Sequence, residues 1–245
     1  IDSLVASQVI TNVKGWEVEH FYDFHNMYSV DSTDKRKAVG VDIALQSGRT
    51  FDNHVVRLSA HSQANPLSAN PNVVYPISRD NYTKKYALST ALLVWALYDL
   101  ELPSTDDGKM MLMSIDSSFK GYYSGFKNVQ VDWLEKMGME EMIYLQERHT
   151  AQDFVDVKRR FKSSEKIYLD KNGILQTQMQ LEGISDLLEM EIVLPEKHFD
   201  LRKEFTRSSI QLNPNKSYNN GVVEVQHNPF SMALTGKHVL QLTKF

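Results

Sequence analysis

Apolar and polar residues alternate at helical spacing at the start of the chain. Val5, Val9 and Val13 recur every four residues, which places them on one face of a helix over residues 4–14. Gly15 follows directly, and glycine readily adopts the left-handed conformation that ends helices. The pattern therefore predicts a first helix that stops at Gly15.

Strand-like patterns follow this helix. Residues 16–24, WEVEHFYDF, alternate between apolar and polar side chains, and strands are also expected within residues 37–45 and 47–58. Residues 60–82 are rich in Ser, Asn and Pro, which predicts a long loop. The first third of the chain therefore reads as a helix followed by strands.

The strongest helical pattern is ALSTALLVWALYDLELP, residues 87–103. Ser89 or Thr90 is expected to cap this helix, and Pro103 to end it. The methionine-rich stretch that follows predicts a short helix or strand leading to Asp116, with its methionines in the core.

After about residue 160 the sequence pattern changes to short strand-like runs. Asn172 and Gly173 predict the turn of a hairpin, because this pair readily supplies positive φ angles. Five further short strands are expected, at residues 190–195, 208–213, 221–227, 230–236 and 238–244.

Helix–strand alternation followed by short strands predicts two domains. Residues 1–155 are expected to form an α/β domain with a mainly parallel sheet and flanking helices. Residues 160–245 are expected to form a smaller, mostly antiparallel α+β domain.

Composition narrows the functional classes. The 245 residues are 42% hydrophobic and 24% charged, as in folded globular proteins, and no apolar run is long enough to span a membrane. The net charge of −4 argues against a protein that coats duplex DNA. The chain has no cysteine, so any metal must bind carboxylates, imidazoles or amides. The first ten residues lack the features of a signal peptide, and we expect a cytoplasmic protein.

Acidic residues stand near the ends of several predicted elements. In α/β domains such positions commonly meet at one edge of a sheet, where carboxylates need a cation to compensate their repulsion. Oxygen ligands with an imidazole suit Mn²⁺ or Mg²⁺. The residues of this set are Asp2, Asp23, Asp52, Asn53, His54 and Asp116.

The order of these residues resembles the DHH phosphoesterases, which usually carry a second, DHHA1 domain. The start IDSLVAS is similar to the family's D-x-D motif from its second Asp, which would be Asp2. By this resemblance the motif's first Asp, and the first strand, would precede Ile1. Asp23 is similar to the Asp that bridges two metals, and Asp42 competes with it for that role.

Further landmarks follow in the family's order. Asp52, Asn53 and His54 stand where the family has D-H-H, although Asn53 replaces a metal-binding His. The pattern of residues 87–100 resembles the helix that follows this motif, and Asp116 resembles the fourth-motif Asp.

The second domain retains less of the family pattern. Gly236, Lys237 and His238 are similar to part of a glycine-rich loop that binds substrate phosphate. A glycine turn between two strands explains the same three residues without a ligand.

The resemblance implies an enzyme: a divergent hydrolase with two Mn²⁺ or Mg²⁺ ions in a cleft between two domains. The implied metal ligands are Asp2, Asp23, Asn53 and Asp116; the implied catalytic residues are Asp23, Asp52, His54 and Asp116. The substrate would be a phosphate ester or anhydride of a nucleotide, or a short or single-stranded nucleic acid.

Two alternatives remain open at the level of sequence. The protein could keep the fold without turnover, as a nucleotide- or nucleic-acid-binding or assembly protein, and Asn53 favours this interpretation. Each acid could also serve only as a helix cap or turn former. The sequence does not fix the substrate or the oligomeric state.

Overall fold

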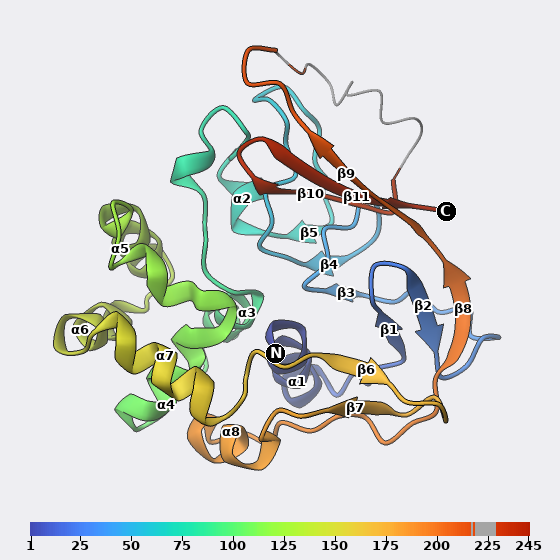
Figure 1. The fold of residues 1–245 in the computed structure, drawn as a ribbon, viewed down its shortest axis with the longest axis horizontal. Helices are drawn as coiled ribbons and strands as arrows, with labels where there is room; N and C mark the ends of the chain where they lie inside the picture. The colour runs from blue at the N-terminus through green and yellow to red at the C-terminus, as the bar shows by residue number, and fades with distance from the viewer. Residues whose placement is uncertain (217, 219–228) are drawn as a thin grey trace. The chain divides into compact units, whose positions relative to one another are not determined.

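The chain forms two compact units, each built from two separate segments. The computed structural model describes residues 1–216, 218 and 229–245. The first unit contains Ile1–Val18 with Ala87–His198, and the second contains Glu19–Tyr86 with Phe199–Phe245. Figure 1 shows the whole chain as a ribbon.

This division differs from the one expected from sequence. A boundary between residues 155 and 160 falls inside a helix of the first unit, Ala151–Arg160. The change of sequence pattern near residue 160 reflects a change in secondary structure, whereas the units are defined by which segments pack together. The chain leaves the first unit after Val18 and returns to it at Ala87.

The first unit is mainly helical. Its helices are α1 (Asp2–Lys14), α3 (Thr90–Leu97), α4 (Asp106–Ser114), the 3₁₀ segment η2 (Ile115–Gly121), α5 (Lys127–Lys136), α6 (Glu140–Arg148), α7 (Ala151–Arg160) and α8 (Leu181–Leu188). Its strands are β6 (Ile167–Leu169) and β7 (Leu175–Thr177). No helix in the described part of the chain is long and apolar enough to cross a bilayer.

Two groups of helices bury the apolar stripes of the first unit. The helix α1 packs on α3, with Val5 and Val9 fully buried, and Gly15 ends α1 in the left-handed conformation as predicted. The helix α4 packs against α6, α7 and α8. Met111 and Met113 are fully buried in α4, which confirms that the methionine-rich stretch belongs to the core.

The second unit consists of short strands and small helices. Its strands are β1 (His20–Tyr22), β2 (Asn26–Ser29), β3 (Gly40–Val41), β4 (Thr50–Phe51), β5 (Ser68–Ala69), β8 (Asp200–Glu204), β9 (Thr206–Gln211), β10 (Ser231–Gly236) and β11 (Val239–Lys244). Its helices are α2 (Pro71–Val74) and the 3₁₀ segment η1 (Tyr82–Lys84).

The protein is mixed α/β, but parallel pairing is a small part of the described structure. Among the named strands of the described residues, only β3, β4 and β5 pair in parallel, with β4 in the centre, and an isolated parallel bridge joins Arg57 to Ser78. Each of these strands has two residues, and residues 42–49 connect β3 to β4 without a helix. The connection between β3 and β4 thus lacks the crossover helix that joins the strands of a large parallel sheet. The expected mainly parallel sheet is not observed.

The other sheets of the second unit are antiparallel. One sheet has the order β1-β2-β8, and another has the order β10-β11-β9. Isolated bridges pair Leu45 with Ser231 and Val55 with Leu234, so the segments beside β4 border the free edge of β10. The buried side chains of Val55, Leu58, Leu234 and others form the core beneath this region.

Several observed elements differ from those predicted. The helix α3 is capped by Ser89 as expected but ends at Leu97, because Asp99 takes a positive φ of 51° before Pro103 is reached. Residues 60–82 contain β5 and α2 in place of a plain loop. Residues 190–195 form no strand.

The strands expected after residue 160 are otherwise largely present. The hairpin of β6 and β7 turns at Gly173, which has a φ of 73°. Strands β9, β10 and β11 correspond to three of the predicted runs. The strand expected at residues 221–227 lies outside the described residues.

Candidate functional site

The carboxyl ends of the three parallel strands place polar residues in a row. Asp42, Asp52 and Asn70 directly follow β3, β4 and β5. The N–H of Asp42 donates to the carbonyl of Phe51 at 2.8 Å, and the N–H of Asp52 donates to that of Ala69 at 3.1 Å. Ligands commonly bind at this edge of parallel strands.

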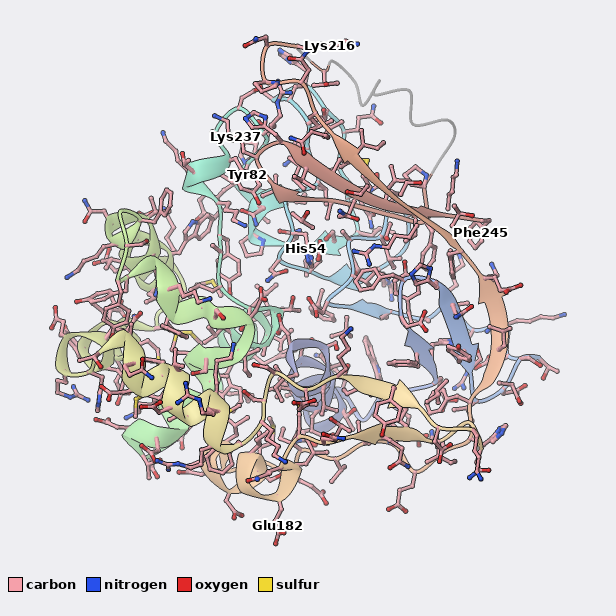
Figure 2. All side chains as sticks on the ribbon, viewed as in Figure 1. His54, Tyr82, Glu182, Lys216, Lys237 and Phe245 are labelled. Carbon is pink, nitrogen blue, oxygen red and sulfur yellow. The ribbon has the colours of Figure 1, made fainter. Side chains whose placement is uncertain are left out.

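Asp52 and His54 form a close side-chain pair at this edge. His54 Nδ1 lies 2.6 Å from Asp52 Oδ1. The Asp52 side chain is 1% exposed, whereas that of His54 is 36% exposed. The imidazole is therefore held from the protein interior while part of its ring reaches solvent. Figure 2 labels His54 in the second unit.

Asn70 holds both residues of this pair through one amide group. Its Nδ2 donates to Asp52 Oδ2 at 2.9 Å and to the carbonyl oxygen of His54 at 2.8 Å. Its Oδ1 accepts from the N–H of Asn72 at 2.8 Å, which caps α2. Asn70 is buried, so each of these bonds replaces one that water would otherwise make.

Asn72 links the backbone of Asn53, between Asp52 and His54, to the backbone of Tyr86. Its Nδ2 donates to the carbonyl of Asn53 at 2.7 Å and to that of Tyr86 at 3.0 Å, and its Oδ1 accepts from the N–H of Tyr86. Sequence reasoning missed Asn70 and Asn72 because they lie in the expected loop. The usable signal was the Asn-Pro pair at residues 70–71, since proline favours the first helical position after an Asn cap.

The Asp52–His54 pair has the arrangement needed for proton transfer or metal binding. With Asp52 ionised, Nδ1 of His54 carries the proton and donates to the carboxylate. Nε2 then becomes the basic nitrogen. A histidine oriented in this way can accept or donate a proton, or can bind a metal while the carboxylate fixes its tautomer.

The donors at this edge fit a hard divalent cation by chemical type. Asp42 and Asp52 supply carboxylates, and His54 supplies an imidazole. Within the part of the chain that the structure describes, no group of three or more acidic or imidazole side chains is arranged to hold a metal. Mg²⁺ often binds through one or two carboxylates, with water and substrate phosphate completing its shell.

Asp23 serves the turn between β1 and β2. Its Oδ1 accepts from the N–H of His25 at 2.9 Å and from that of Asn26 at 2.6 Å. It belongs to the β1-β2-β8 sheet, whereas Asp42 is the acid beside Asp52 in the parallel sheet. Of these two acids, Asp42 is the one that follows a strand paired with the strand before Asp52.

Asp2 caps helix α3. Its Oδ2 accepts from the N–H of Thr90 at 2.9 Å, and its Oδ1 accepts from that of Ala91 at 2.7 Å. Its side chain is buried. Both carboxylate oxygens thus stabilise a helix N-terminus, where negative charge is favourable. This contact explains why an acid stands at position 2 without invoking a metal.

Asp116 also belongs to the first unit, so the structure brings it together with neither Asp23 nor Asp52 within one unit. It follows helix α4 and not a strand, and its side chain is exposed. Its backbone is left-handed, with φ 49° and ψ 20°. These features differ from the strand-end position that the sequence pattern indicated.

The predicted substrate loop, Gly236, Lys237 and His238, forms the turn between β10 and β11 in the second unit. A β-bulge lies between Leu234 and Gly236. A side chain at Gly236 would meet only Val239, at 3.7 Å or more, so this turn does not require glycine for space. Lys237 is exposed and is labelled in Figure 2.

Comparison of the chain with protein-family models, curated proteins and solved structures gave no match. The resemblance to the DHH phosphoesterases therefore depends on the order of the residues alone.

Proposed function

We propose that this protein is a metal-dependent phosphoesterase whose reactive centre is the Asp52–His54 pair at the carboxyl edge of β3, β4 and β5. Its substrate would be a phosphate ester or anhydride of a nucleotide, or a short nucleic acid. The observation that supports this most is the 2.6 Å contact between a buried carboxylate and a partly exposed imidazole. The stretch from Asp52 to His54, which resembles the D-H-H motif, is the part of the sequence resemblance that lies at this edge.

In this proposal His54 moves the proton. Asp52 holds Nδ1–H, so Nε2 takes a proton from the attacking water or gives one to the leaving oxygen. Burial of Asp52 and its two hydrogen bonds keep the imidazole in one orientation, which removes the need to order it during the reaction.

The proposal includes a divalent cation, Mn²⁺ or Mg²⁺. Asp42 and Asp52 are the carboxylates of the second unit that would contribute to holding it, with water and substrate phosphate completing its shell, while Nε2 of His54 is kept for the proton. When bound, it would supply an acidified water and would neutralise charge on the phosphoryl oxygens.

The proposal predicts that His54→Ala lowers phosphoesterase activity by about 10²- to 10⁴-fold, the usual contribution of a general acid–base residue. The assay uses the full chain with millimolar Mn²⁺ and a panel of phosphate diesters and monoesters. His61→Ala is the matched control, because His61 is an exposed histidine with no assigned role. Equal activity of wild type and His54→Ala on every hydrolysed ester would refute the assignment.

Two observations favour a second candidate, a nucleotide-binding protein without turnover. Asn53 stands where the resembled family has a metal-binding histidine, and the described residues form no three-ligand metal group. This candidate predicts that the wild type hydrolyses no ester of the panel yet binds nucleotides. Turnover by the wild type that is lost in His54→Ala would exclude it.

A further inference from the structure

An exposed aromatic ring in the second unit lies on a strained backbone. Phe24, in the turn between β1 and β2, has a φ of 74°, a left-handed conformation that bulky residues rarely adopt. Asp23 holds this turn, because its Oδ1 accepts from the N–H groups of His25 and Asn26. Glycine or asparagine would fit the backbone better, and Phe24 is 51% exposed, so core packing does not explain a ring at this position. Strain of this kind points to a functional role for the side chain.

Phe24 belongs to a cluster of five aromatic rings. The centroid of Tyr22 lies 5.5 Å from that of Phe24, 5.3 Å from that of Phe205 and 5.5 Å from that of Phe230. Phe205 and Phe230 also contact Phe245, with centroids 5.1 and 5.6 Å away. Phe245, labelled in Figure 2, is 69% exposed, whereas Phe205 is buried and Tyr22 and Phe230 are partly buried. The cluster therefore presents two rings to solvent, those of Phe24 and Phe245.

Hydrogen bonds hold the inner rings of this aromatic cluster in place. Tyr22 Oη donates to Thr243 Oγ1 at 2.7 Å, which joins β1 to β11. The N–H of Phe205 donates to the carbonyl of His25 at 2.6 Å, and the N–H of Phe230 donates to that of Thr243 at 2.8 Å. The exposed rings pack on this fixed base, so a ligand that stacks on them has little conformational freedom to remove.

A basic side chain lies over each exposed ring. Lys203 Nζ lies 4.2 Å from the ring centroid of Phe245, and Arg207 Cζ lies 5.0 Å from that of Phe24. Both basic residues are exposed. Glu204 directly follows Lys203 in β8, so its side chain points to the opposite face of the strand. This face therefore combines two exposed aromatic rings with two positive charges.

Exposed rings beside cations suit a ligand that carries both flat bases and phosphates. Every nucleobase has a face that stacks on an aromatic ring, and the phosphates of the same strand attract lysine and arginine. In a duplex the bases stack on one another, so their faces are not available to the protein. An apolar protein surface would cover the rings but would offer no anion to the two cations. The combination favours single-stranded nucleic acid.

We propose that this face of the second unit binds single-stranded nucleic acid. The binding surface consists of Phe24, Phe245, Lys203 and Arg207. Bases stack on the two rings, and the two basic side chains move from the rings to the phosphates, because both are long and exposed. The binding does not depend on the reaction proposed above, whereas the assignment of the bound strand as a substrate rests on that proposed function.

Fluorescence anisotropy of a labelled oligothymidylate of about ten nucleotides tests this surface, with the full chain in EDTA to prevent metal-dependent turnover. Wild type is expected to bind saturably, and at least about tenfold more tightly than it binds a duplex of the same length. Phe24→Ala and Phe245→Ala should each weaken binding about 5- to 100-fold, the effect of losing one stacked base. Phe126→Ala removes a ring of similar exposure, 50%, from the first unit and should stay within about twofold of wild type.

Phe24→Asn separates binding from folding. Asparagine tolerates the left-handed conformation, so this variant should resist denaturant at least as well as wild type and yet bind as weakly as Phe24→Ala. Arg207→Gln and Lys203→Gln should each weaken binding several-fold and reduce its salt dependence, because each removes one phosphate contact.

The outcomes separate this inference from the proposed reaction. His54→Ala should bind the oligonucleotide like wild type. Oligonucleotide binding without hydrolysis of any ester would refute the proposed function alone, and ester hydrolysis without oligonucleotide binding would overturn this inference alone. The inference is also overturned if the duplex binds as tightly as the single strand, or if Phe24→Asn and Phe245→Ala bind like wild type. Self-association of a wild type that binds no oligonucleotide would instead assign the rings to a contact between two copies of the chain.

Discussion

Asn70 sets the geometry of the candidate site through a single amide group. Its nitrogen donates to the Asp52 carboxylate and to the His54 carbonyl, and its oxygen caps α2. An ionised aspartate in its place could still cap the helix but could not donate to Asp52. The side chain of residue 70 must donate to the Asp52 carboxylate and the His54 carbonyl, and must also accept from the N–H of Asn72. An amide does both.

This argument predicts a pH-dependent defect in Asn70→Asp. Two buried carboxylates would share one proton, so the pKa of the pair in the folded state would rise above the ordinary value near 4. The stability of the variant relative to wild type is then highest below about pH 4 and falls as pH rises through the folded pKa. We expect an additional loss of about 1–3 kcal/mol between pH 5 and pH 7 in urea unfolding.

The exposed substitution Asn128→Asp on α5 serves as the control and should show no such trend. A pH-independent loss in Asn70→Asp would mean that residue 70 does not lie against an ionised Asp52.

At the scale of elements, the N-terminus of α3 shows how two distant segments complete one helix. Ser89 Oγ accepts from the N–H of Leu92 at 3.1 Å, and Asp2 accepts from those of Thr90 and Ala91. Three N–H groups without intrahelical partners are thus satisfied inside the first unit. The acid that the sequence suggested as a metal ligand has a structural role that the spacing of residues 2 and 90 could not reveal.

Removing this cap should destabilise the protein. Asp2→Ala leaves two buried N–H groups without their acceptors, and we expect a loss of about 2–3 kcal/mol in the free energy of unfolding. Glu135→Ala, an exposed acid on α5, should change stability by less than about 0.5 kcal/mol. Denaturant unfolding measures both. A wild-type stability for Asp2→Ala would show that the carboxylate does not cap α3.

Elements with a long periodic pattern could be predicted, and elements fixed by tertiary contacts could not. The stripe of Val5 and Val9 and the stop at Gly15 predict α1 closely. The parallel strands have two residues each, too few for any periodicity. In residues 190–195, the prediction assumed that backbone N–H groups would pair with a neighbouring strand. The N–H of Ile192 instead donates to the side chain of Ser185, at 2.9 Å from Oγ.

At the scale of the whole molecule, the chain crosses between units three times, and this interleaving decides which residues can meet within one unit. Asp52 and His54, two residues apart, were correctly placed near a strand end, and the structure adds their direct contact. Asp2 and Asp116 fall in the first unit, whereas Asp23 and Asp52 fall in the second. Sequence order alone could not supply that partition, because it depends on long-range packing.

The location of the cation tests the central claim most directly. In wild-type protein, substoichiometric Mn²⁺ broadens the amide resonances of residues close to the bound ion. The proposed centre predicts selective broadening at Asp42, Asp52–His54 and Asn70, reduced in Asp42→Asn and unchanged in His61→Ala. Broadening centred instead on Asp23 or on Asp116, or no site-selective broadening at millimolar Mn²⁺, would contradict the assignment of the reactive centre to the edge of β3, β4 and β5.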